Sequence, residues 1–127
     1  MHEGIKTLTS HHSVDETVTR LETLLKEKGV KLFYIVDHSG EAHAAGVTMP
    51  NTKLLIFGNP KAGTPLMLAA PSTALDLPLK ILVAETPDGT TQLFWNDPSW
   101  LQSRHGFPTD LEANLSAAAL LAGKAAE

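Results

Sequence analysis

Hydrophobic residues recur at helical spacing near the start of the chain. They lie at Val14, Val18, Leu21 and Leu25, and steps of three or four residues place such side chains on one face of a helix. Ser13, just before this run, and Glu16, within it, form a capping box, in which a hydroxyl and a carboxylate bond the first backbone amides. Gly29 supplies a left-handed stop. The pattern predicts an amphipathic helix between Ser13 and Gly29.

A second helical pattern occupies the last part of the sequence. Thr109 and Glu112 repeat the capping-box arrangement, and apolar residues mark one face of the segment that follows, at Leu111, Leu115, Ala118 and Ala122. Alanine favours the helix strongly, and small side chains allow close packing on a sheet or another helix. We therefore expect one helix that begins after Thr109.

Short runs of β-branched and aromatic residues separate the two helices and also precede the first. Strands are predicted at residues 5–9, 31–36, 53–57, 79–85 and 91–95. Pro87-Asp88-Gly89 predicts a hairpin between the last two. Short helices are expected before Gly46, after Asn59-Pro60 and after Asp97-Pro98. The resulting order, β-α-β-α-β-α-β-β-α-α, predicts an α+β fold with a single mixed, largely antiparallel sheet backed by helices.

Composition sets limits on the classes of function. The 127 residues are 43% hydrophobic and carry a net charge of −4, which favours one globular domain over residues 1–127 and counts against nucleic acid as a partner. The absence of cysteine excludes disulfides, thiolate metal sites and a cysteine nucleophile. With no apolar run of the length that a leader or a membrane span needs, we expect a cytoplasmic protein without a membrane partner.

Three turns each follow a predicted strand and open a helix. They are Asp37-His38, Gly58-Asn59-Pro60 and Asn96-Asp97-Pro98. Free amides at such turns suit anions or polar groups of a ligand. The same side chains also serve simply as helix caps, and the two roles are compatible.

Histidine and lysine residues supply the remaining candidate chemistry. His105 ends a short predicted helix beside Arg104, where the helix dipole stabilises a cation and where an imidazole can also transfer protons. Lys80 lies in an otherwise apolar strand, either with its ammonium reaching solvent or aimed at an anion in a cleft.

No cofactor motif is present. Residues 58–64 contain glycine, lysine and threonine, but not in the order of a P-loop, and no serine lies in a nucleophile elbow. We therefore expect no cofactor and no dedicated metal site. A long-range metal or haem site stays open as a lesser alternative, with four conceivable ligands: His38, His105, Met49 and Met67.

Five short motifs follow one another along the chain: Phe57-Gly58-Asn59-Pro60-Lys61, Thr64-Pro65-Leu66-Met67, Asp76-Leu77-Pro78-Leu79-Lys80, Asn96-Asp97-Pro98 and Arg104-His105-Gly106. With His38 ahead of a small-residue helix, they resemble domain-of-unknown-function family 302 over roughly residues 5–121. The resemblance implies a compact α+β fold and a homodimer, and no established reaction. Trp95 stands where the family commonly has tyrosine, so we assign it to packing or ligand stacking.

Three functions remain open, and the first is favoured. It is a domain that binds or senses a small anionic or polar molecule in one cleft, through Asn59, Lys80, Asn96, Arg104 and Trp95. The second is an enzyme with His105 or His38 as general acid or base and Asp97 orienting the ring. The third is a dimeric interaction module without a small-molecule site.

Overall fold

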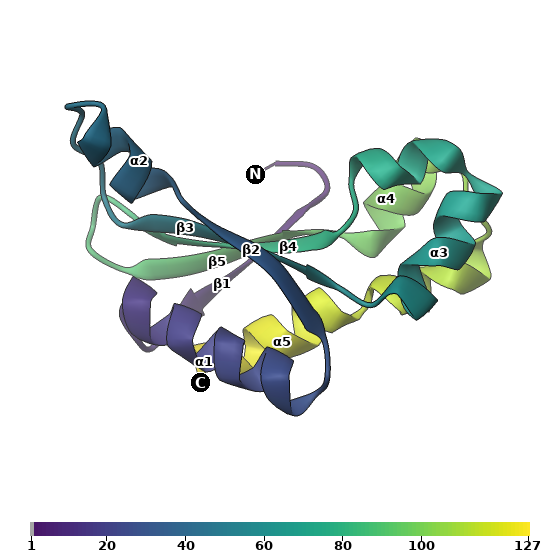
Figure 1. Ribbon diagram of the computed structural model, residues 1–127, viewed down its shortest axis with the longest axis horizontal. Helices are drawn as coiled ribbons and strands as arrows, with labels where there is room; N and C mark the ends of the chain where they lie inside the picture. The colour runs from purple at the N-terminus through teal and green to yellow at the C-terminus, as the bar shows by residue number, and fades with distance from the viewer. Residues whose placement is uncertain (1) are drawn as a thin grey trace.

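A computed structural model describes residues 2–127, in which strands and helices alternate along the chain (Figure 1). The strands are β1 (Ile5–Ser10), β2 (Lys31–Asp37), β3 (Thr52–Gly58), β4 (Leu79–Glu85) and β5 (Thr91–Asn96). The α-helices are α1 (Val14–Glu27), α2 (His38–Ala44), α3 (Pro60–Ala69), α4 (Pro98–His105) and α5 (Ala117–Ala126). Two 3₁₀ helices complete the described chain, η1 (Pro71–Leu75) and η2 (Thr109–Leu115).

The five strands form one sheet in the order β1-β5-β4-β3-β2, and every neighbouring pair is antiparallel. The predicted hairpin between β4 and β5 is confirmed: the Thr86 amide donates to the Thr90 carbonyl at 2.8 Å. Gly89 takes a φ of +85° in this turn, a conformation that glycine adopts without steric cost. The predicted α+β class and element order are therefore confirmed.

Helix α1 covers one face of the sheet. Half of the predicted capping box is present, because the Ser13 hydroxyl accepts from the Glu16 amide at 3.1 Å, but among the described residues the Glu16 carboxylate makes no bond back to the Ser13 amide. The Glu16 carboxylate lies 3.4 Å from the His12 ring. Leu21 and Leu25 are fully buried between this helix and the sheet, so the periodicity of the sequence corresponds to the packed face.

The prediction of one final helix beginning at Thr109 is wrong. Pro108 precedes a 3₁₀ helix that has no side-chain cap, and the α-helix begins only at Ala117. A tertiary contact holds the 3₁₀ segment, since the Asn114 amide nitrogen donates to the Ala62 carbonyl of α3 at 3.0 Å. Local helix preference was therefore overridden by packing against α3.

Helix α5 packs beside α1 on the same face of the sheet (Figure 1). Its small residues Ala122 and Ala125 are fully buried. Arg20 of α1 fastens the contact, because its Nε donates to the Ala125 carbonyl at 2.9 Å and its Nη2 to the Lys124 carbonyl at 3.1 Å. The apolar face of α5 is thus used inside the chain's own core.

A second apolar cluster forms a lobe at one end of the sheet. It joins four buried residues: Leu66 of α3, Leu101 of α4, Leu115 of η2, and Phe107, which lies between α4 and η2. In Figure 1 this lobe lies at the right, and α2 lies at the opposite end of the long axis. Of the residues with candidate chemistry, Asn59, Arg104 and His105 lie on the helices of this lobe, whereas His38 begins α2.

Candidate functional site

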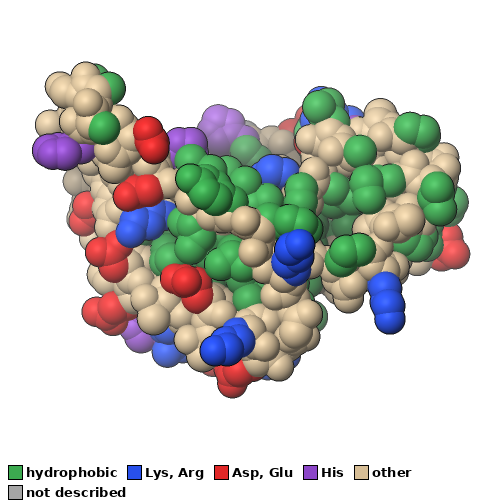
Figure 2. Space-filling model, viewed as in Figure 1, with side chains coloured by type: hydrophobic (Ala, Val, Ile, Leu, Met, Phe, Trp, Pro, Cys, Tyr) green, Lys and Arg blue, Asp and Glu red, His purple; other side chains and the backbone are tan. Residues whose placement is uncertain are grey.

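An apolar pocket of about 420 Å³ lies where the lobe meets the sheet. Its wall comes from the ends of β2 and β3, from α3, from the segment before β4 and from η2 and the start of α5: Val30, Phe33, Phe57, Gly58, Asn59, Pro60, Ala62, Gly63, Thr64, Met67, Leu77, Pro78, Leu79, Asn114, Leu115 and Ala117. Figure 2 shows hydrophobic side chains around the hollow between the main body and the lobe. Cavities of this size commonly hold small molecules.

The start of α3 shapes one side of the pocket. Asn59 ends the extended chain after β3, and its side-chain oxygen accepts from the Lys61 amide at 3.0 Å, so the predicted cap is confirmed. Gly63 follows one turn later and leaves the wall without a side chain. A Cβ atom placed there would lie 3.5 Å from Leu77 Cδ1 and 3.9 Å from Met67 Cε, which is ordinary contact. Asn59, Thr64 and Asn114 provide polar atoms in this mainly apolar wall.

A polar cluster centred on Asp76 lies in the same lobe but outside the pocket wall. His105 Nε2 lies 2.5 Å from Asp76 Oδ2, and Arg104 Nη1 lies 3.1 Å from the same oxygen. On its other side, His105 Nδ1 lies 2.8 Å from the Ser72 hydroxyl. The His105 side chain is 3% exposed and Asp76 15%, whereas Arg104 is 44% exposed. The cluster is therefore shielded at its centre and open at its rim.

Lys80 extends the cluster toward the sheet. Its Nζ donates to the Pro78 carbonyl at 2.8 Å and to the Asp76 carbonyl at 3.4 Å. Partial burial lowers the pKa of Lys80, and the negative charge of Asp76 acts in the opposite direction. The ammonium therefore donates hydrogen bonds to backbone carbonyls before β4, and the Asp76 carboxylate attracts its positive charge.

The predicted site residues do not share one cavity. Asn59 lies in the pocket wall, whereas Lys80, Arg104 and His105 meet around Asp76. Asp97 caps α4 by accepting from the Ser99 amide at 3.2 Å.

The other predicted site residues lie elsewhere. Asn96 pairs with Ile5 at the end of β5, and Trp95 packs against the main core. His38 begins α2 at the far end of the molecule (Figure 1).

Sequence reasoning gave no site role to the two side chains that connect this cluster, Ser72 and Asp76, although Asp76 opens the third family motif. Asp76 follows a 3₁₀ turn and precedes the apolar segment 77–79, where a single carboxylate is a weak signal. Its partner His105 lies 29 residues further along the chain. Ser72 carried no local motif. Only the packing of η1 against α4 brings the three together.

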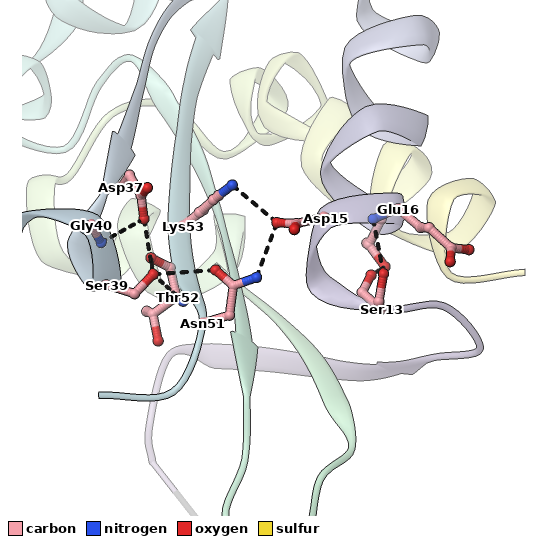
Figure 3. Close-up of polar contacts among 10 residues, drawn as sticks. Ser13, Asp15, Glu16, Asp37, Ser39, Gly40, Asn51, Thr52 and Lys53 are labelled. Atoms are coloured by element: carbon pink, nitrogen blue, oxygen red, sulfur yellow. Dashed lines mark hydrogen bonds and ion pairs between the residues drawn. The ribbon is translucent and has the colours of Figure 1, made fainter. Parts of the chain in front are cut away.

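A separate polar network anchors α2 at the opposite end of the sheet (Figure 3). Asp37 caps α2 by accepting from the Gly40 amide at 2.9 Å, and this bond lowers the pKa of its carboxyl. Asn51 and Lys53 each donate to Asp15 Oδ1 at 3.0 Å. These bonds, Asn51 first, lower the pKa of Asp15. The Ser39 hydroxyl of α2 also donates to Asn51 Oδ1 at 3.2 Å, so the network joins α1, α2 and β3.

The arrangement of the described side chains and helices bears on metal binding and membrane insertion. Within residues 2–127, no group of three or more histidine, aspartate or glutamate side chains is arranged to hold a metal ion. In the same part of the chain, no helix combines the length and the apolar character needed to cross a bilayer.

Curated relatives of the chain carry the name of a channel. "Fluoride-specific ion channel FluC 1" of Brucella suis biovar 1 (strain 1330) is 40% identical over 120 residues, which are 94% of this chain and 46% of that protein. FluC 1 of Brucella abortus biovar 1 (strain 9-941) is also 40% identical over 120 residues, with 44% of its length covered. The chain thus spans less than half the length of these relatives.

A solved structure and a family model match nearly the whole chain. The crystal structure of an uncharacterized conserved DUF302 protein from Bacillus stearothermophilus has a TM-score of 0.79 and 18% sequence identity, and the match covers 98% of this chain and 97% of that one. It has the same fold. The match to the family described as "Domain of unknown function DUF302" extends over residues 6–121, and the chain belongs to this family.

Proposed function

We propose that the protein binds a small, largely apolar molecule in the pocket between α3 and the sheet. The observation that carries this proposal is the pocket itself, about 420 Å³ in volume and lined by aromatic and aliphatic side chains. Binding sites for small molecules combine such a lining with a few polar groups that orient the ligand. Thr64 supplies such a group here, and so do the amide atoms of Asn59 and Asn114 that do not bond the backbone of α3.

The charges of the lobe favour an apolar ligand over an anionic one. An anion in the pocket would need a cation in the pocket wall, but Arg104 and His105 bond the carboxylate of Asp76 outside that wall. Lys80 donates to two carbonyl oxygens of the chain itself. None of these three cationic residues belongs to the pocket wall. This distribution supports a more apolar ligand than the sequence predicts.

A pair of substitutions at Gly63 tests the proposal. Gly63→Leu would project an isobutyl group from the wall toward Leu77 and Met67, whereas the methyl group of Gly63→Ala fits at ordinary contact distance. Both changes favour the helix, since glycine costs about 1 kcal/mol relative to alanine. The probe is N-phenyl-1-naphthylamine, an uncharged dye that fluoresces in apolar sites.

We expect saturable dye binding by the wild type and by Gly63→Ala, and at least tenfold weaker binding by Gly63→Leu. Circular dichroism checks that both variants keep the native helix content. Equal affinity of all three proteins, with intact folding, would refute the pocket as the binding site.

The similarity to part of the FluC relatives favours a second candidate, an accessory domain that acts beside a fluoride channel. It rests on the 40% identity over 120 residues of each relative. In this role the pocket ligand would regulate the channel. A host strain without this chain would then grow more slowly in sodium fluoride than its parent. Identical growth of the two strains over a range of fluoride concentrations would exclude this candidate.

A further inference from the structure

Ser72, His105 and Asp76 form an unbroken chain of hydrogen bonds across the lobe. The Ser72 hydroxyl lies 2.8 Å from His105 Nδ1, and His105 Nε2 lies 2.5 Å from Asp76 Oδ2. A hydroxyl, an imidazole and a carboxylate connected in this order constitute the nucleophile, base and orienting group of acyl-transfer sites. The array is separate from the apolar pocket, whose wall contains none of these three residues.

The partners of the imidazole determine where its proton lies. An ionised carboxylate is only an acceptor, so Asp76 requires the hydrogen on His105 Nε2. A neutral ring then has its lone pair on Nδ1, which faces the Ser72 hydroxyl. Ser72 donates its proton to that nitrogen, which is the arrangement that activates an alcohol for attack.

Burial differs along the array in the way that such chemistry requires. The side chain of His105 is 3% exposed and that of Asp76 15% exposed, so the base and its orienting group are shielded. Ser72 is exposed, so a substrate reaches its hydroxyl directly from solvent. Arg104 also bonds Asp76 Oδ2 at 3.1 Å, which fixes the carboxylate from a second side.

The two elements that carry the array hold it in place. Ser72 and Asp76 lie at either end of η1, and His105 is the last residue of α4. Gly106 takes a φ of +76° and ends the helix immediately afterwards, where its amide bonds the Gln102 carbonyl at 2.7 Å. The ring therefore projects from a defined helix end rather than from a loop.

We propose that Ser72 is a nucleophile that accepts acyl groups from activated esters, with His105 as its base and Asp76 as the positioning residue. Ser72 Oγ attacks the ester carbonyl carbon while its proton moves to His105 Nδ1. The carbon–oxygen bond of the ester breaks, and the departing oxygen takes the proton from His105, leaving an acyl-serine. Water then attacks the acyl-serine with the same proton transfers, releasing a carboxylic acid and regenerating the Ser72 hydroxyl.

The test uses 4-nitrophenyl acetate and the full chain. The wild type is expected to release 4-nitrophenolate and to carry an acetyl group that peptide mapping locates on Ser72. Ser72→Ala should lower the release at least tenfold and abolish that modification. Ser103→Ala is the matched control, since Ser103 is an exposed serine of α4 outside the array. Acetylation spread over lysines, with equal rates in the wild type and Ser72→Ala, would overturn the proposal.

A second set of variants tests the base and the positioning residue. Loss of a general base lowers such rates by about a hundredfold or more, so His105→Gln should acetylate Ser72 at a small fraction of the wild-type rate. Asp76→Asn should keep the reaction but change its pH profile, because the ring loses its preferred tautomer. A wild-type acetylation rate in His105→Gln contradicts the proposal. If these variants fail to fold, the comparison of Ser72→Ala with Ser103→Ala decides, since both sites are exposed.

Discussion

The carboxylate of Asp76 connects three elements of the lobe, and its removal should destabilise the protein measurably. Asp76→Ala takes away the acceptor of the buried His105 ring and the partner of Arg104. It also leaves Lys80 without a nearby carboxylate. The change removes no core packing, because Asp76 lies at the end of η1 rather than in either apolar cluster.

The contacts give the size of the effect. A buried donor that loses its partner costs about 1–3 kcal/mol, and His105 Nε2 is such a donor. The bond to Arg104 adds little, since a pair with one partner 44% exposed is screened by water and contributes about 0.2–1 kcal/mol. We therefore expect Asp76→Ala to lower the free energy of unfolding by about 2–3 kcal/mol, or the melting temperature by roughly 10 °C.

Urea unfolding followed by tryptophan fluorescence measures this change. The chain has two tryptophans, and Trp100 packs against the apolar cluster of the lobe. The midpoint should fall without a change in the slope m, since the surface exposed on unfolding stays the same. Asp110→Ala, at an exposed position of η2, is the control and should change stability by less than about 0.5 kcal/mol.

Unfolding of Asp76→Ala at the wild-type midpoint would show that the bonds of the Asp76 carboxylate do not stabilise the fold. A double-mutant cycle with Arg104→Ala separates the two partners of the carboxylate. We expect a coupling energy below about 1 kcal/mol for the exposed Arg104 pair. A larger coupling energy would mean that Asp76 stabilises the protein mainly through the Arg104 guanidinium rather than through the buried His105 ring.

Three further predictions address other parts of the fold. Because the folded-state pKa of Asp15 is lowered, the stability it provides is present above its unfolded pKa of about 3.9 and is lost as the pH falls through the lower folded value. Asp15→Asn should therefore be less stable than the wild type by about 0.5 kcal/mol at pH 6, and this difference should shrink as the pH falls below the unfolded pKa. A difference that stays constant with pH in urea titrations would contradict the assignment. Gly4→Ala should lower the free energy of unfolding by about 3 kcal/mol, because φ is positive there and the new Cβ would meet the Trp100 ring. Gly89→Ala has a positive φ but open space around it, so it should cost only about 1 kcal/mol. Equal melting temperatures of the two variants would count against the contact between Gly4 and Trp100. Thr73 Oγ1 is buried without a partner among the described residues. Thr73→Val should therefore leave the free energy of unfolding unchanged or raise it by up to about 1 kcal/mol. A clearly lower melting temperature in calorimetry would show that the hydroxyl is bonded.

The sequence predicted those parts of the fold that depend on neighbouring residues. The five strands were identified because each is a short β-forming run between breakers. Asn59 and Asp97 cap their helices as expected, because a cap needs only a side-chain oxygen two residues before the amide that it accepts. Local signals of this kind survive folding.

The last helix shows where local signals fail. Helix preference and a Thr109–Glu112 capping box favoured one continuous helix. In the structure, the segment after Pro108 is first a 3₁₀ helix, and the α-helix follows it. The bond from Asn114 to the Ala62 carbonyl is the physical reason that we identify, and its partners lie 52 residues apart. Contacts at such separations depend on the tertiary fold.

The site was half predictable for the same reason. Arg104, His105 and Lys80 were selected by residue type, but their common partner Asp76 could not be paired with them from local patterns. The pocket is a different case. Its wall consists mainly of apolar residues and of Gly63, which a search for polar chemistry passes over. Only the three-dimensional arrangement of α3 against the sheet reveals it.

Amide chemical shifts recorded by NMR during titration with N-phenyl-1-naphthylamine locate the bound ligand on the protein. If the ligand site is the pocket, the largest shifts will occur at the amides of Gly58, Asn59 and Gly63 and at the side chain of Asn114. The face of the sheet opposite α1 carries exposed apolar side chains such as Tyr34 and Ile5 and offers a competing surface. Shifts confined to that face, with the pocket residues unchanged, would contradict the account.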